Sequence, residues 1–267
     1  MHPMERLRSV ARATGAGPGV LVQEAAGALT ALGDDPAGLV TACRRLVARH
    51  PAVGPMWWLC SRVLCAADPM AEAWRAAAEM EADATPAVLC GAVPDEASVV
   101  VLGWPDQVVD GLRRRGDVEI LLVSGGGEAA GLGRRLRAVD VLVEEVPDAG
   151  LGAAAAEADL VVLEASVVGP EWFVATPGSR AAAAVARSTG RPVWLVAGVG
   201  RVVPARMWRA VESSLGASAL PAWERDHELV PLSLCDQVVR PTGLRTPDDE
   251  DDEAPCPVAP ELLRTAL

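Results

Sequence analysis

A glycine run, Ser124-Gly125-Gly126-Gly127, is the segment of this sequence best suited to hold an anion. It follows the apolar run Glu119–Val123 and precedes a stretch of helical composition that starts at Gly133. Glycines in such a turn let backbone N–H groups approach a phosphate, and the N-terminus of the next helix adds a favourable dipole. The run fits neither a dinucleotide fingerprint nor a Walker loop, so a plain turn between strand and helix stays open as the alternative.

Charged side chains that would complete an anion site lie close to this run or at the end of another apolar run. Arg134 and Arg135 carry fork-shaped donors suited to a phosphate, with solvent exposure on a helix as the alternative. Arg201 comes after an apolar run and is the best-placed cation. Asp148 also ends such a run, where its carboxylate would either bind ribose hydroxyl groups or cap a helix over Ala153–Glu157.

Composition excludes several reaction types. The 267 residues include no Lys, Asn or Tyr, as expected for a GC-rich genome, so Schiff-base lysine and tyrosine acid–base chemistry are excluded. The six cysteines form no CxxC pair and have no His at metal-ligand spacing. This pattern predicts buried free thiols in a reducing compartment, no metal site and no cofactor. Neither His50 nor His227 has a visible Ser or Cys partner for a catalytic triad.

Charge and hydropathy limit the kind of partner. The net charge of -12 argues against general nucleic-acid binding, which needs a basic face. Part of this charge lies in the run Asp248–Glu253, which we interpret as a solvated tail. No stretch reaches the roughly 20 apolar residues of a membrane helix, and the N-terminus leads into no apolar signal core. We therefore predict a cytoplasmic protein without a membrane partner.

The elements that would position these residues change in type along the chain. Residues 21 to 82 show apolar positions at helical spacing, interrupted by proline turns. From about residue 97, short apolar runs alternate with stretches of helical length, and no run alternates with period two, which is typical of strands buried on both faces of a parallel sheet. The expected strands are Val99–Leu102, Glu119–Val123, Val139–Val143, Leu160–Leu163 and Val193–Val196.

The predicted fold is α/β, a Rossmann-like parallel sheet with flanking helices, preceded by a small helical domain. We place the helical domain at residues 1–85, the α/β domain at 86–245 and an acidic, Pro-rich tail at 246–267, with poor order expected from about Pro241. Ligands of such sheets bind beyond the carboxyl ends of the strands, where the candidate residues stand.

Motifs in the second half resemble those of one family. The segment Ala158–Ser166 is similar to a "DLVLVGAD" strand, Gly178-Ser179 to a Gly-Thr turn, and Arg191–Ala197 to a "PvyV" strand. Glu228–Pro231 resembles a closing "E-x-V-P" motif, and Pro51-Ala52-Val53 an entry motif of the helical domain. These motifs, in this order, are those of the initiation factor 2B α/β/δ subunits and the methylthioribose-1-phosphate and ribose-1,5-bisphosphate isomerases. The chain resembles a divergent bacterial member.

The resemblance implies that the isomerase chemistry is lost. The family's isomerases use a strand-end Cys and the Asp of "GAD" to move protons, and these positions hold Trp104 and Ser166 here. The substrate-holding "NKxGT" keeps only Gly178 and Ser179 as ligand candidates, and the phosphate-contacting "SRP" is replaced by the glycines at 125–127. Glu164 is the carboxylate that would take over as a base if activity persists.

We interpret the chain as a non-catalytic regulatory or assembly module that binds a sugar phosphate or nucleotide. The alternative is an aldose–ketose isomerase of a ribose phosphate, with Glu164 or Asp148 as the base. The expected partner is a second copy or a relative of the same family, forming a homodimer or heterodimer. The apolar residues expected at that interface are Trp172, Phe173, Val174, Met207 and Trp208, with a role in the core between helix and sheet as the alternative.

Overall fold

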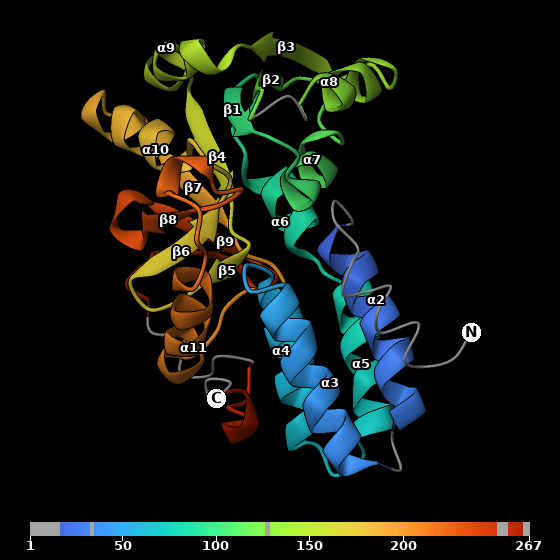
Figure 1. Cartoon of the computed structure of the whole chain (residues 1–267). Coiled ribbons are helices and arrows are strands. Elements are labelled where there is room, and N and C mark those ends of the chain that lie inside the picture. Colours follow the sequence, from blue (N-terminus) through green and yellow to red (C-terminus); the bar gives the residue numbers. More distant parts are fainter. Residues whose placement is uncertain (1–16, 33–34, 126–128, 250–255, 264–267) are drawn as a thin grey trace.

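A layer of helices is followed by an α/β unit in the computed structural model, which describes residues 17–32, 35–125, 129–249 and 256–263 (Figure 1). Each of the first five helices has a proline in its first turn, where the missing N–H costs nothing. Asp35 and Asp68 cap two of them by accepting from Gly38 N and Ala71 N. The helices are α2 (Pro18–Leu29), α3 (Pro36–Arg49), α4 (Gly54–Cys65), α5 (Pro69–Glu81) and α6 (Thr85–Ala92).

A seven-stranded sheet in the order β10-β9-β7-β4-β1-β2-β3 forms the centre of the second half. All neighbouring strands pair in parallel except β10 and β9, so the predicted Rossmann-like α/β fold is confirmed. Its strands are β1 (Ser98–Leu102), β2 (Glu119–Val123), β3 (Leu142–Val146), β4 (Leu160–Glu164), β7 (Val193–Val196), β9 (Gln237–Arg240) and β10 (Gly243–Arg245). An antiparallel sheet combines β5 (Val167–Val168), β6 (Trp172–Ala175) and β8 (Glu228–Pro231).

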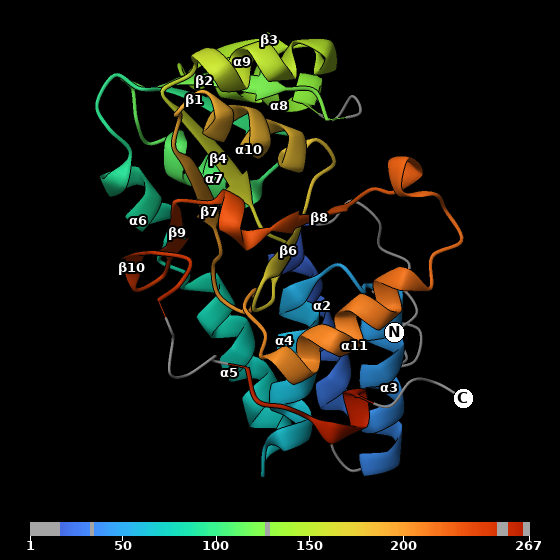
Figure 2. The same cartoon turned by 90° about the vertical axis from the view of Figure 1, so that its left-hand side faces the viewer.

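Helices cover both faces of the large sheet (Figures 1 and 2). Val99 and Val101 of β1 join a buried cluster with α6, α7 and α8, whereas Val100 and Leu102 face α9 and α10. Apolar residues on both faces explain why the central strands read as continuous apolar runs. These helices are α7 (Asp106–Leu112), α8 (Ala129–Arg137), α9 (Leu151–Glu157) and α10 (Ser179–Ser188). Short 3-10 helices occur at Thr30–Leu32, Asp148–Gly150, Ala222–Glu224, Leu232–Leu234 and Pro260–Leu262.

The strand predicted at Val139–Val143 is shifted to Leu142–Val146. The chain leaves α8 through a tight turn in which Asp140 adopts a φ of +60°, and Val139 is exposed there. Pairing with β2 therefore begins only at Leu142. Because β3 is an edge strand and mostly exposed, the expectation that every strand is buried on both faces is wrong for this one.

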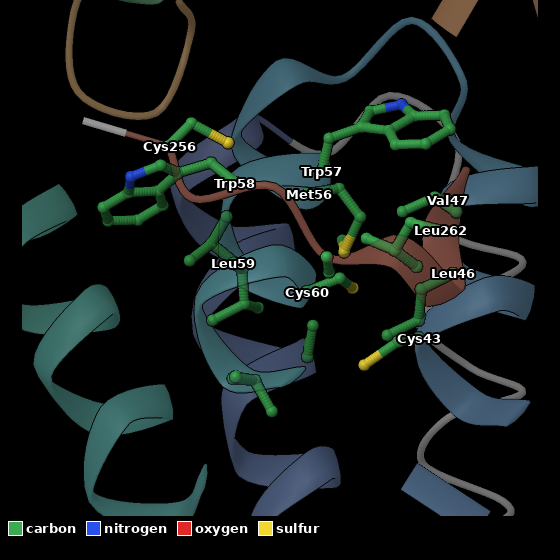
Figure 3. Close-up of a cluster of buried hydrophobic side chains, with 14 of the residues drawn as sticks. Cys43, Leu46, Val47, Met56, Trp57, Trp58, Leu59, Cys60, Cys256 and Leu262 are labelled. Carbon is green, nitrogen blue, oxygen red and sulfur yellow. The ribbon is translucent and has the colours of Figure 1, made fainter. Parts of the chain in front are cut away.

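The helical layer shares its core with later parts of the chain. Its buried cluster includes Met207 and Trp208 of α11 (Ala205–Gly216), and Cys256 and Leu262 near the end of the described residues. Figure 3 shows Cys256 and Leu262 among the side chains of α3 and α4. The prediction of poor order from about Pro241 is wrong for β10 and for Cys256–Leu262, because these segments gain strand pairing or apolar burial.

The predicted interface residues are mostly core residues. Phe173, Val174, Met207 and Trp208 are buried inside the chain, and Trp172 is partly buried against the helical layer. Their burial has a local cause, since one face of α11 packs on the small sheet and the helical layer. These side chains therefore give no evidence for an interface. None of the described helices is both long enough and apolar enough to span a membrane.

Candidate functional site

The carboxyl ends of β1, β2, β3, β4 and β7 form one edge of the sheet, where the predicted site residues stand. The polar side chains of this edge fall into two groups. The central group surrounds Glu164 and Arg201 at the ends of β4 and β7. The outer group surrounds Trp104, Gly125 and Asp148 at the ends of β1, β2 and β3.

Glu164 and Arg201 form a buried ion pair at the centre of the edge. Arg201 Nη2 lies 2.7 Å from Glu164 Oε1, and the two side chains are 3% and 9% exposed. Arg201 Nη1 donates to the carbonyl oxygen of Ala165. Arg201 Nε is buried and has no hydrogen-bond partner among the described residues. The best-placed cation of the sequence is therefore directed at the protein's own carboxylate rather than at a ligand.

The second oxygen of Glu164 is also occupied. Glu164 Oε2 accepts from the backbone N–H groups of Gln107 and Val108, in the first turn of α7, at 2.8 and 3.1 Å. Burial raises the pKa of this carboxyl, while Arg201 and the two N–H groups act in the opposite direction. Both oxygens of Glu164 thus have protein partners, which leaves the predicted replacement base without a position facing solvent.

A polar network continues from this pair toward the helical layer. Gln107 donates through Nε2 to Asp83 Oδ2 at 2.5 Å and accepts from Gly198 N at 3.2 Å. Asp83 also accepts from Val199 N and from both donors of Thr85. Sequence reasoning missed Asp83 and Gln107 as parts of the site. The pattern Asp83-Ala84-Thr85-Pro86, with a side-chain acceptor just ahead of a helix start, is the signal that points to Asp83.

Trp104 and Arg135 line an open groove beside the central group. The Arg135 guanidinium carbon lies 5.2 Å from the centre of the Trp104 ring, within the range of a cation–π contact. The groove has a volume of about 320 Å³ and also includes Asp106 and Val109 of α7. Arg134 is exposed on the same helix and takes no part in this contact. Of the two predicted arginines, Arg135 is the one that faces the strand ends.

Asp106 connects the two groups and was not singled out from the sequence. Although its side chain is reached by solvent, partial burial raises the pKa of its carboxyl. The charges of Arg201 and Arg135 act in the opposite direction. Asp106 is therefore a carboxyl with an altered proton affinity at the border of the open groove. Its place after the strand end at Gly103-Trp104 was the available signal.

Asp148 and Gly125 meet at the ends of β3 and β2. Gly125 N donates to Asp148 Oδ1 at 2.9 Å. The prediction that Asp148 caps the helix at Ala153–Glu157 is wrong, because α9 starts at Leu151 without a side-chain cap.

Gly125 has a φ of +53°, and a Cβ there would lie 3.0 Å from Gly103 Cα. The half of the glycine run at Gly126 and Gly127 lies outside the described residues. Ser124 is half-buried, and its N–H donates to Val146 O.

Gly178 and Ser179 lie at the start of α10, beside the outer group. Gly178 has a φ of +98°, and Ser179 Oγ donates to Thr176 O at 2.7 Å in a buried position. Glu228 of β8 accepts from Arg180 N at 2.7 Å and so places a carboxylate at this helix N-terminus. The two residues kept from the family's substrate motif are thus used in local structure.

Ser166 links the edge to the helical layer through its backbone. Its N–H donates to Val174 O, and its carbonyl oxygen accepts from Gly54 N at 3.0 Å. Trp104 follows β1, the neighbour of β4 in the sheet. Neither a serine nor a tryptophan side chain titrates near neutral pH. Within the described residues, no three His, Cys, Asp or Glu side chains are grouped as metal ligands would be.

No protein-family model matches this sequence, and no curated protein matches it significantly. Solved structures do match. The translation initiation factor eIF-2B of Pyrococcus horikoshii OT3 is 16% identical with a TM-score of 0.78, over 92% of this chain and 97% of that chain. The eIF2B beta subunit of Chaetomium thermophilum is 16% identical with a TM-score of 0.71, over 92% of this chain and 86% of that chain. The 5-methylthioribose 1-phosphate isomerase of P. horikoshii OT3 is 14% identical with a TM-score of 0.64, over 92% of this chain and 84% of that chain. The chain therefore has the fold of the initiation factor 2B subunits and of this isomerase, as its motifs predicted.

Proposed function

We propose that this chain is a non-catalytic regulatory or assembly module that binds a sugar phosphate or nucleotide at the open groove of its strand-end edge. One observation carries the proposal. Both oxygens of Glu164, the carboxylate at the centre of the edge, are bound by Arg201 and by the first turn of α7. A base that is buried and fully hydrogen-bonded cannot reach a substrate carbon.

The other positions at which the family's isomerases or the sequence place a catalytic group also support a non-catalytic role. Aldose–ketose isomerisation moves a proton between neighbouring carbons, which requires an acid and a base placed beside the substrate. Trp104 and Ser166 supply neither, and Asp148 is engaged by Gly125 N. These three positions therefore supply no free pair of titratable groups that would divide the roles of acid and base.

Binding needs less than catalysis, and the outer group retains what it requires. Arg135 offers a guanidinium with fork-shaped donors, and Trp104 offers the face of a ring next to it. These groups suit a phosphate attached to a sugar or a nucleoside. The groove is open to solvent, so a ligand reaches Arg135 without rearrangement of the buried pair.

The alternative, an isomerase of a ribose phosphate, is favoured by a different residue from those predicted. Asp106 borders the groove, and partial burial raises the pKa of its carboxyl, as a general base requires. Under this alternative Asp106 moves the proton, and Arg135 or Arg201 balances its charge. The activity assay below separates the two functions.

We also propose that the module assembles in the cytoplasm with a second copy or with a relative of the same fold. A neighbouring structure is the tetrameric eIF2B-beta2-delta2 complex of C. thermophilum, 15% identical with a TM-score of 0.70. Trp223, which is 84% exposed in the short 3-10 helix before β8, and the nearby exposed Leu220 are among the apolar groups available for such a contact. Light scattering at tens of micromolar tests this assembly, and a monomer unchanged by Trp223→Glu removes it from the proposal.

The test of the site combines an activity assay with a binding assay. Purified protein is expected not to convert methylthioribose 1-phosphate or ribose 1,5-bisphosphate above background. The same compounds are expected to raise the melting temperature, because a ligand that binds only the folded state stabilises it. Arg135→Gln should abolish this shift, and Arg134→Gln, on the same helix but without the contact to Trp104, is the matched control. Turnover that disappears in Asp106→Asn establishes the isomerase instead.

A further inference from the structure

A second groove lies away from the strand ends, between α3, α11 and the segment that ends at Leu263. Its volume is about 610 Å³, within the range of small-molecule sites. Figure 2 shows α11 and the C-terminal segment next to α3. We propose that this groove binds a phosphorylated small molecule with an apolar or planar body. This site goes beyond the proposed function, since none of its elements belongs to the sheet edge.

Three arginines give the groove a positive charge. Arg206 and Arg209 lie three residues apart on α11 and therefore on one face of the helix, and Arg44 faces them from α3. Arg206 and Arg209 are exposed, and neither forms an ion pair with the described residues. The described residues that line the groove include no carboxylate, although Glu212 stands on the same helix. In a chain of net charge -12, the exposed guanidinium groups of Arg206 and Arg209 form a local site for an anion, and Arg44 lies beside them.

Hydroxyl groups extend this polar wall along α11. Ser213 and Ser214 both line the groove one turn beyond Arg209. Ser214 donates to Ala210 O at 2.9 Å, whereas Ser213 Oγ makes no hydrogen bond to the described residues. Ser213 is therefore free to donate to a phosphate or a sugar hydroxyl. From Arg206 to Ala217 the helix spans roughly 16 Å, a length that fits a nucleotide-sized ligand.

The floor of the groove is apolar and is built from three separate segments. Val47 of α3, Trp57 of α4 and Leu262 lie close together there, as Figure 3 shows. The C-terminal segment is held in place by Ser61, which donates to Pro257 O and accepts from Ala259 N at 3.0 Å. Charged groups at the rim above an apolar floor match a ligand with an anionic end and an apolar body.

Nucleic acid fits these observations less well than a small anion. A polyanion gains affinity by releasing counterions over an extended basic surface. Here the positive charge is confined to one groove on an acidic molecule, so a long polymer would meet repulsion on either side. The confined groove therefore favours a single phosphorylated compound.

Isothermal titration of the full chain with ADP, inorganic pyrophosphate and adenosine tests the proposal. ADP is expected to bind more tightly than pyrophosphate or adenosine, because only ADP uses both the arginines and the apolar floor. The double variant Arg206→Gln/Arg209→Gln should weaken ADP at least tenfold. Arg45→Gln is the matched control, since Arg45 is exposed on α3 but does not line the groove, and it should change the affinity less than twofold.

Two further measurements distinguish this groove from the strand-end groove and a small anion from a peptide ligand. Arg135→Gln should leave ADP affinity unchanged, which separates this groove from the strand-end edge. If ADP binding is lost in Arg135→Gln but not in the double variant, the second site is wrong while the proposed function stands. Absence of binding by the wild-type chain at millimolar ADP, or binding of an acidic hexapeptide in place of ADP, also overturns the proposal. Circular dichroism confirms that the exposed substitutions leave the fold intact.

Discussion

The two halves of the strand-end edge use the same kinds of residue in opposite ways. At the centre, Glu164 and Arg201 are buried and hydrogen-bonded to each other and to the backbone. At the outer end, Trp104 and Arg135 contact each other beside a groove that is open to solvent. A charge that is buried must be satisfied by the protein, so the central pair serves the fold. In the outer half, by contrast, the Arg135 guanidinium remains exposed to solvent.

Removal of one partner of the central pair should have the largest effect on stability. Arg201→Met leaves the Glu164 carboxylate buried without its cation, which should lower the free energy of unfolding by about 3–5 kcal/mol. Adding Glu164→Gln removes the orphaned charge and keeps an oxygen for the α7 N–H groups, so at least half of the loss should return. Urea denaturation measures both variants.

The exposed pair Arg187–Asp236, at 3.6 Å, is the control for the central pair. Because solvent screens this pair, Arg187→Met should cost about 1 kcal/mol or less. A loss of similar size in Arg201→Met and Arg187→Met would contradict the view that the centre of the edge is devoted to stability.

A second, smaller effect should come from the outer half. Gly125→Ala places a Cβ 3.0 Å from Gly103 Cα at a residue with a φ of +53°. The combined crowding and left-handed conformation should lower the free energy of unfolding by about 1–3 kcal/mol. Gly152→Ala is the matched control, since a Cβ at Gly152 in α9 meets nothing within 4 Å, and it should stabilise the helix by up to about 1 kcal/mol. Equal effects at the two glycines would show that the turn at Gly125 is not tightly packed.

The smallest effect concerns Asp106, at the border of the two halves. Its pKa is raised in the folded chain, so the protonated carboxyl is favoured there more than in the unfolded chain. The stability that Asp106 contributes is therefore present below its unfolded pKa of about 3.9 and is lost as the pH rises through the folded pKa. Asp106→Asn should be slightly more stable than the wild type at pH 7, and the difference should vanish below about pH 4.

Thermal unfolding of Asp106→Asn across this pH range provides the measurement. Glu144→Gln, on the exposed edge strand β3, controls for the loss of one negative charge. A stability difference for Asp106→Asn that grows as the pH falls would reverse the assigned sign and remove the case for Asp106 as a base.

The sequence alone determined the fold class, because the signal for it is local. Central strands such as β1 and β4 are continuous apolar runs, and the helices α2 to α5 have a proline at their first or second residue and end before turns. It also determined which residues reach the strand ends, since parallel strands bring their carboxyl ends to one edge. Trp104, Asp148, Glu164 and Arg201 all stand there for that reason.

Contacts between distant segments of the chain determine which of these residues stay exposed to solvent. Arg201 and Glu164 are 37 residues apart, and nothing local in either segment indicates that they pair. The same holds for Trp208, which the sequence placed at an interface and the fold placed in the core, on the buried face of α11. Partner choice over such separations depends on which helices and strands pack together. Burial then decides whether a charge serves the fold or a ligand, because an unpaired charge is stable only where water reaches it.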